Sequence, residues 1–172
     1  MNRLTLTPKI LLLITICFFS VWLGGYIARL IAVYPLFDPI ELTLKSFYVS
    51  HLESVFYTLL PLIILNLISF SCFLIMFILF LFSSKLNLKI NGWLFIIVLI
   101  VFITAPFEIY LSLIDYKIIK AILNNINDVN SILEMVRERM VKLSSFSLIE
   151  VFSYLAVIFL ALFQPLTKKN EN

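Results

Sequence analysis

Four long apolar segments limit what this chain can fold into more than any other feature. They run from about 10 to 36, 55 to 82, 93 to 113 and 146 to 163. A helix rises about 1.5 Å per residue, so each segment can cross a hydrocarbon core about 30 Å thick. Of the 172 residues, 62% are hydrophobic and only 13% are charged, whereas a soluble domain is about half apolar and about a quarter charged. The sequence therefore predicts an all-α, polytopic integral membrane protein.

The four segments and their connections account for nearly the whole chain, so we expect a single membrane domain, residues 1–172, folded as a four-transmembrane-helix bundle. The first segment starts like a signal peptide, but its apolar run is too long and no small-residue cleavage site follows a short core. We therefore interpret it as a retained helix. Tyr34-Pro35 and Asp38-Pro39 are expected to end it, because the residue before a proline is pushed out of helical geometry.

Basic residues predict the orientation. An inside N-terminus puts six of them on short inner flanks, and the same number on the longer outer connections, which influence orientation less. The inner set is Arg3, Lys9, Lys85, Lys89, Lys168 and Lys169, and the outer set is Lys45, Lys117, Lys120, Arg137, Arg139 and Lys142. Both termini are thus expected inside. The richness in Asn, Lys and Ile suggests an AT-rich bacterial genome, so the predicted location is a bacterial inner (cytoplasmic) membrane.

The connection between the third and fourth segments, about 116 to 143, carries a heptad-like apolar stripe. Its members recur at spacings of three and four: Ile119, Ile122, Ile126, Val129, Leu133, Val136, Met140 and Leu143. One amphipathic helix or two shorter ones with a break near Asn127 both fit this pattern. We expect the stripe to lie on the membrane surface, to cover the outer mouth of the bundle, or to dock a partner.

Two opposite charges lie deep in the apolar segments. Arg29 lies roughly 9 Å outward from the middle of the first segment, and Glu108 roughly 7–8 Å outward from the middle of the third. Both segments run in the same direction, so the two charges are at similar depths. A charge in hydrocarbon is costly and usually finds a partner inside the bundle. The pair is interpreted either as a polar site or gate, or as a structural clasp, with Arg29 snorkelling alone to the interface as a further alternative.

Thr104 and Pro106 lie within a turn of Glu108. Proline removes an intrahelical hydrogen bond and frees the carbonyl near Phe102, and Thr104 adds a hydroxyl. Broken helices with a carboxylate bind cations or relay protons in transporters, although proline is also common in membrane helices without such a role.

Small residues recur every four positions in the first segment and form a helix-packing face. They are Ser20, Gly24, Ala28 and Ala32. The sequence favours packing of this face within the bundle over homodimerisation.

Three Ser-x-x-Glu capping boxes are expected, at Ser50–Glu53, Ser131–Glu134 and Ser147–Glu150. Glu53 and Glu150, together with His51, could also join the intramembrane charges in an outer polar cluster. Capping already explains both carboxylates, so this cluster is the less favoured interpretation.

Motifs for catalysis and for cofactors are missing from the sequence: there is no phosphate-binding loop, dinucleotide fingerprint or nucleophile elbow. His51 is the only histidine, and the two cysteines form no ligand motif, so neither a metal site nor a cofactor is predicted. The expected partners are the lipid bilayer and a protein partner or a second copy of the chain, not nucleic acid, because the basic residues flank apolar segments.

The leading hypothesis is a non-enzymatic accessory, scaffold or assembly subunit of a bacterial inner-membrane complex that binds its partner through the extracytoplasmic amphipathic loop. The alternative is a small oligomeric transporter or channel that uses Arg29 and Glu108. A membrane enzyme acting on lipid, with Glu108, Glu150 or His51 as a base, comes third because no motif supports it.

Overall fold

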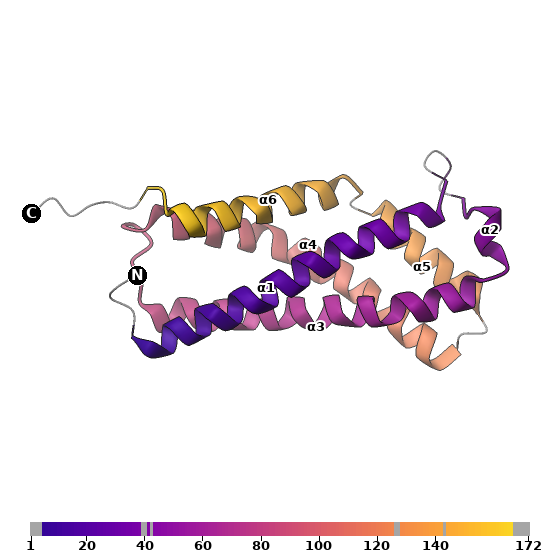
Figure 1. Cartoon of the computed structure of the whole chain (residues 1–172), viewed down its shortest axis with the longest axis horizontal. Helices are drawn as coiled ribbons and strands as arrows, with labels where there is room; N and C mark the ends of the chain where they lie inside the picture. The colour runs from indigo at the N-terminus through magenta and orange to yellow at the C-terminus, as the bar shows by residue number, and fades with distance from the viewer. Residues whose placement is uncertain (1–4, 39–40, 42, 126–127, 143, 167–172) are drawn as a thin grey trace, which may run out of the picture.

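The computed structural model describes residues 5–38, 41, 43–125, 128–142 and 144–166. This described part is helical and contains no strand, only an isolated antiparallel bridge between Phe37 and Leu44. Its elements, in chain order (Figure 1), are α1 (Leu6–Val33), the 3-10 turn η1 (Tyr34–Leu36), α2 (Ser46–Val49), α3 (Leu52–Ser84), α4 (Gly92–Asn125), α5 (Val129–Val141) and α6 (Ser144–Phe163).

Four helices in the described part are long and apolar enough to cross a membrane: α1 with η1, α3, α4 and α6. Their outward surfaces are apolar, and side chains as large as Phe82 and Phe102 are 80% and 78% exposed. Several charged and amide side chains are instead buried among the helices, Arg29 and Asn66 included. Large exposed apolar surfaces are unusual on soluble monomers. Apolar side chains on the outside and polar side chains among the helices suggest a membrane-embedded protein.

The ends of the long helices are marked by residues with restricted backbones. Pro35 lies at the start of η1, where its missing N–H is not needed. Lys85, directly after α3, has a left-handed φ of 50°, the conformation that commonly ends a helix. Gln164 follows α6 with a φ of 46°, and it precedes Pro165, which disfavours a helical conformation at that position.

The helices pack as two long pairs. α1 lies along α3 in the most extensive contact of the structure, and α4 packs against both α3 and α6, whereas α1 and α6 barely touch. α1 begins and α6 ends at one end of the molecule, and α2 and α5 lie at the opposite end, called here the α2–α5 end (Figure 1). α1 and α4 run in the same direction, the arrangement that puts their charged residues at comparable depths.

Two apolar cores occupy the two halves of the molecule. The half in which α1 begins contains an aromatic core around Trp22, Phe70, Phe73 and Tyr154. The half at the α2–α5 end contains a mainly aliphatic core, in which α4 and α5 contribute Leu111, Ile114, Ile118, Ile122, Ile132 and Val136. On α1 the first core ends at Tyr26 and the second begins at Val33, so Arg29 lies between them.

The third apolar segment was predicted to end near 113, but α4 continues to Asn125. Its buried face continues through Leu111, Ile114, Ile118 and Ile122 at helical spacing, so packing extends the helix past the charge of Asp115. Two helices, rather than one, then form the connection: α4 ends at Asn125 and α5 begins at Val129.

Candidate functional site

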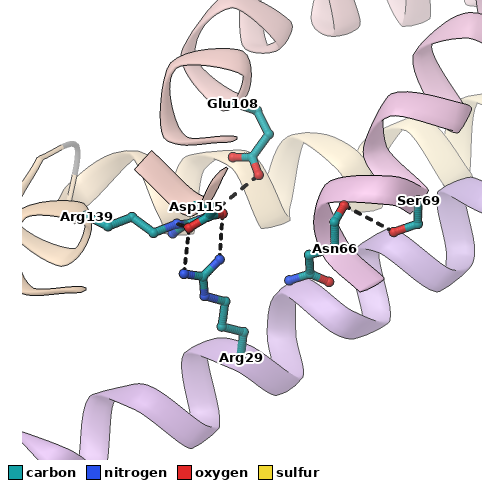
Figure 2. A network of polar contacts seen from close by, with 6 residues as sticks. All are labelled: Arg29, Asn66, Ser69, Glu108, Asp115 and Arg139. Atoms are coloured by element: carbon teal, nitrogen blue, oxygen red, sulfur yellow. Dashed lines mark hydrogen bonds and ion pairs between the residues drawn. The ribbon is translucent and has the colours of Figure 1, made fainter. Parts of the chain in front are cut away.

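Four charged side chains from three helices meet in the interior (Figure 2). Arg29 comes from α1, Glu108 and Asp115 come from α4, and Arg139 comes from α5. Their exposed fractions are 4%, 2%, 2% and 7%, respectively. Charged residues at this degree of burial must be paired with one another, and the geometry provides the pairing.

Asp115 is the centre of this network. Arg29 donates to it from both ends of its guanidinium group, from Nη1 to Oδ2 at 2.6 Å and from Nη2 to Oδ1 at 2.7 Å. Arg139 donates a third hydrogen bond, from Nε to Oδ1 at 2.8 Å. Bidentate arginine–carboxylate bonds are among the strongest side-chain contacts in proteins. One carboxylate therefore joins α1, α4 and α5.

Arg139 remains a cation in this setting. Burial opposes its charge, but the carboxylates of Asp115 and Glu108 outweigh that effect and raise the pKa of Arg139 above its ordinary value. Its guanidinium group also lies 5.9 Å from the centre of the Tyr26 ring, within the range of a cation–π contact. At the end of α5, Lys142 Nζ donates to the Tyr110 hydroxyl on α4 at 2.8 Å, which further fastens α5 to α4.

Glu108 is held far less tightly than Asp115. Its Oε1 lies 3.7 Å from Nη2 of Arg139, beyond normal hydrogen-bond distance. Its Oε2, and Nη2 of Arg139, have no hydrogen-bond partner among the described residues. Glu108 and Asp115 are seven residues apart on α4, about two helical turns, so they share one face but differ sharply in their partners.

Glu150 of α6 adds a third buried carboxyl group and is 0% exposed. It lies within electrostatic range of Glu108 and of the Tyr26 hydroxyl, yet neither of its oxygens has a hydrogen bond of normal geometry to a described residue. Like charges that face one another in a medium of low dielectric constant repel strongly. Glu108 and Glu150, called here the carboxyl pair, are therefore the least satisfied part of the network.

Thr104 and Tyr154 lie on the other side of the carboxyl pair. Their hydroxyl groups form a hydrogen bond of 2.8 Å between α4 and α6, and Thr104 also donates to the Ile100 carbonyl at 2.9 Å. Tyr154 then packs against Trp22, with ring centres 4.7 Å apart. The Thr104–Tyr154 hydrogen bond is thus the last polar contact before the aromatic core, to which Tyr154 itself belongs. Pro106 lies between Thr104 and Glu108 inside α4, which continues through it.

Asn66 on α3 has a further buried polar side chain that lacks a hydrogen-bond partner among the described residues. Neither side-chain atom of its amide is hydrogen-bonded within the described part of the chain. A Cβ atom added at Gly25 would come within 2.2 Å of Asn66 Oδ1, so α1 and α3 approach each other closely at this point. Trp22 Nε1 and the Tyr26 hydroxyl, on the same stretch of α1, also lack hydrogen-bond partners among the described residues. Buried polar atoms left unpaired are unusual and call for an explanation.

A small cavity of about 20 Å³ lies beside the two arginines. Arg29, Arg139 and Ser147 provide its polar lining, and Tyr34 and Met140 are also part of it. A cavity needs about 10–15 Å³ to hold one water molecule. The cavity is therefore large enough for a single water next to the guanidinium groups, on the side of the network toward the α2–α5 end.

Buried arginine–carboxylate pairs are present, but the direct partner of Arg29 is Asp115, not Glu108. Arg139 bonds to the same Asp115 carboxylate and forms a longer ion pair with Glu108, so Arg29 and Glu108 are linked only through Asp115 and Arg139. Sequence reasoning missed Asp115 and Arg139 because it assigned one to the membrane boundary and the other to an outer loop. The signal was present: Asp115 lies on the face of Leu111, Ile118 and Ile122, and Arg139 lies three residues after Val136.

The predicted outer polar cluster does not form as expected. His51 and Glu53 are exposed, and only Glu150 is buried in the network. Capping was also wrong as its explanation, because α6 begins at Ser144 and Glu150 lies in its second turn. The other two predicted capping boxes are also wrong. The residue before α3 is His51, which makes no side-chain cap. Asp128, not Ser131, caps α5, and its Oδ1 accepts from the Ser131 N–H at 3.2 Å.

The small-residue face of α1 does not pack within the chain. Ser20, Gly24, Ala28 and Ala32 are all exposed, and a Cβ added at Gly24 would meet no described atom within 4 Å. The neighbouring Gly25 makes the close contact with α3 instead. Packing of the small face within the bundle is thus contradicted, and the homodimer alternative stays a prediction.

The apolar stripe of the connection is covered largely by the chain itself. Ile122 and Val136 belong to the core, and Ile119, Val129, Leu133 and Met140 pack against it. Ile126 and Leu143 lie outside the described residues. Of the three placements considered for this stripe, the structure has α5 covering one end of the packed helices.

Comparisons with protein-family models, curated proteins and solved structures found no match to the chain.

Proposed function

We propose that this chain is an integral membrane protein that binds and releases a proton at the carboxyl pair, Glu108 and Glu150, as part of a small transporter or channel. One observation carries the proposal: two buried carboxyl groups lie within electrostatic range of each other, and three of their four oxygens lack a hydrogen bond of normal geometry to a described residue. Intramembrane ionisable residues of this kind often mark proton or ion pathways.

The charges of the network support a proton at this site. Arg29 and Arg139 carry two positive charges, against three carboxyl groups on Asp115, Glu108 and Glu150. Asp115 engages both arginines through hydrogen bonds, so the excess negative charge falls on the carboxyl pair. A net charge inside a membrane is costly. One proton on the pair makes the network neutral, and two carboxyl groups that share a site commonly hold a single proton between them.

A proton fits this site better than a metal ion. Divalent ions such as Ca²⁺ and Mg²⁺ take about six or more oxygen ligands, and the pair offers only three oxygens that lack a hydrogen bond to a described residue. No group of three or more His, Cys, Asp or Glu side chains in the described ranges comes together as a metal site. The guanidinium group of Arg139, 3.7 Å from Glu108, also repels a cation.

The surroundings of the charged network differ between its two sides. The cavity beside Arg29 and Arg139 has room for one water on the side of the α2–α5 end. On the other side, the Thr104–Tyr154 hydrogen bond is followed by the aromatic core. Protons would therefore reach the pair from the α2–α5 end in this conformation, and release toward the other end requires the Thr104–Tyr154 contact to open.

The proposed setting is a four-helix bundle in a bacterial cytoplasmic membrane, with both termini inside. The concentration of lysines near the helix ends on that side supports this orientation. Four helices are few for a transporter, so we propose that two copies associate, and the exposed small-residue face containing Gly24 and Ala28 supports close helix contact between them.

Proton flux into liposomes tests the proposal. Protein reconstituted into vesicles that contain a pH-sensitive dye should acidify the interior when a pH gradient and a compensating potential are applied. Glu108→Gln and Glu150→Gln should each reduce the flux at least tenfold, because an amide cannot exchange a proton.

Glu53→Gln is the matched control, because this glutamate lies on α3 but is exposed, and it should leave the flux unchanged. Flux that is equal in all four proteins, or that is absent from wild-type vesicles, would overturn the proposal. The second outcome would favour the accessory role. That role draws support from the exposed charged side of α5, where the side chain of Glu134 is 69% exposed and that of Arg137 is 39% exposed.

A further inference from the structure

A large apolar cavity lies in the half of the molecule where α1 begins, and none of the charged side chains of the network lines it. Its volume is about 290 Å³, and residues of α1, α3, α4 and α6 line it. The lining is apolar except for Thr15, Ser20 and Gln164, and the Thr15 hydroxyl already donates to the Leu11 carbonyl at 2.7 Å. An apolar ligand in this cavity would therefore make many van der Waals contacts but few hydrogen bonds.

The cavity exists because α1 and α6 are held apart. The two helices barely contact each other, and the space between them is backed by Phe73 and Phe77 of α3 and by Ile97 and Val101 of α4. All four helices are candidate membrane spans. A space between spanning helices that is lined in this way is in contact with hydrocarbon rather than with water.

The dimensions of the cavity fit a hydrocarbon chain. Along α1 the lining runs from Leu12 to Ser20, roughly 12 Å at 1.5 Å per residue. An apolar cavity of about 150 Å³ accommodates one benzene molecule. By the same ratio the cavity between α1 and α6 holds roughly twelve carbon atoms, which is most of one acyl chain.

One end of the cavity lies where lysines are exposed. The lining reaches Leu12 near the start of α1, Phe80 near the end of α3 and Trp93 at the start of α4. Lys9 lies three residues before Leu12, about one helical turn away, and Lys85 and Lys89 lie in the connection between α3 and α4; all three are exposed. Lysines beside a membrane surface attract anionic lipid headgroups.

We propose that this cavity binds one acyl chain of an anionic phospholipid, whose headgroup contacts Lys9, Lys85 and Lys89. The apolar lining favours binding of the acyl chain, and the lysines favour binding of an anionic headgroup. The site is separate from the carboxyl pair and does not depend on the proposed proton function.

Fluorescence quenching tests the site. Trp93 lines the cavity and Trp22 is the only other tryptophan, so a Trp22→Phe background makes Trp93 the reporter. In phosphatidylcholine vesicles, acyl-brominated phosphatidylglycerol should quench Trp93 at a lower mole fraction than acyl-brominated phosphatidylcholine. Each lysine is expected to contribute roughly fivefold to that preference, so Lys9→Gln with Lys85→Gln should reduce it roughly 25-fold.

Ala161→Phe fills the cavity, because Ala161 is part of its lining, and it should remove the preferential quenching. Ala156→Phe adds the same ring to an exposed position of α6 outside the lining, and it should not. Mass spectrometry of lipid that co-purifies with proteins retaining Trp22 gives a readout independent of the Trp22→Phe substitution. Equal quenching by both lipids, or equal lipid content in the Ala161→Phe and Ala156→Phe proteins, would overturn the proposal.

Discussion

At the scale of single residues, the two predicted intramembrane charges are buried, but they are bonded differently from the prediction. Hydropathy identified Arg29 and Glu108 because each interrupts a long apolar run. Hydropathy could not identify Asp115 and Arg139 as their partners. The depth of a residue along its own helix does not show that α5 folds back and brings Arg139 against α4. The carboxylate of Asp115 accepts three hydrogen bonds from two arginines, whereas Glu108 and Glu150 together leave three oxygens unbonded within the described chain.

Asp115→Asn should destabilise the protein strongly, because it removes the negative charge that Arg29 and Arg139 share. Removing one partner of a buried ion pair costs about 3–5 kcal/mol, which a denaturant titration of the purified protein would measure as a lower free energy of unfolding. Arg29→Leu combined with Asp115→Leu should cost less than the sum of the two single changes.

Asp128→Asn is the control for this substitution. Asp128 is exposed and caps α5, and asparagine caps helices about as well as aspartate. An Asp115→Asn protein as stable as the Asp128→Asn protein would contradict the network described here.

At the scale of helices, the sequence located the four apolar segments well but not how they contact one another. Spacing predicted a small-residue face at Gly24, yet the close contact is made by Gly25, one position along, because Asn66 of α3 lies against it. The pattern of small residues does not say which side of a helix faces a neighbour when the opposite side faces lipid. The length of α4 was likewise underestimated, since the charge at Asp115 resembles a helix end until its arginine partners are known.

Gly25→Ala and Gly24→Ala should therefore have opposite effects. The first puts a Cβ within 2.2 Å of Asn66 Oδ1, and overpacking of this kind costs about 1–3 kcal/mol of unfolding free energy. The second meets no described atom within 4 Å and should stabilise α1 of the monomer by up to about 1 kcal/mol, because alanine favours helix more than glycine. Thermal unfolding of the two proteins in the same detergent would measure the difference.

Asn66→Ala should relieve the Gly25→Ala defect, since it removes the atoms that the new methyl group meets. Equal melting temperatures for the Gly24→Ala and Gly25→Ala proteins would mean that α1 presents a different side to α3.

At the scale of the whole molecule, apolar side chains cover the outside and a charged layer separates two apolar cores. Composition alone was enough to predict helices that can span a membrane. The position of α5 was not predictable in the same way, because an amphipathic helix can lie on a membrane, dock a partner or fold back on its own chain with the same sequence pattern. Here Ile132 and Val136 are buried in the second core, and Arg139 completes the network.

The most direct test of the account is whether the carboxyl pair carries a proton inside the folded protein. Infrared difference spectroscopy of the protein in lipid bilayers detects the C=O stretch of a protonated carboxyl group during a pH titration. We predict such a band near neutral pH, its loss in Glu150→Gln and its loss or shift in Glu108→Gln, because these two buried side chains lie within electrostatic range of each other and three of their four oxygens lack a hydrogen bond of normal geometry to a described residue. A spectrum with only ionised carboxylates at neutral pH, or a band unchanged in both variants, would contradict the proposed proton site.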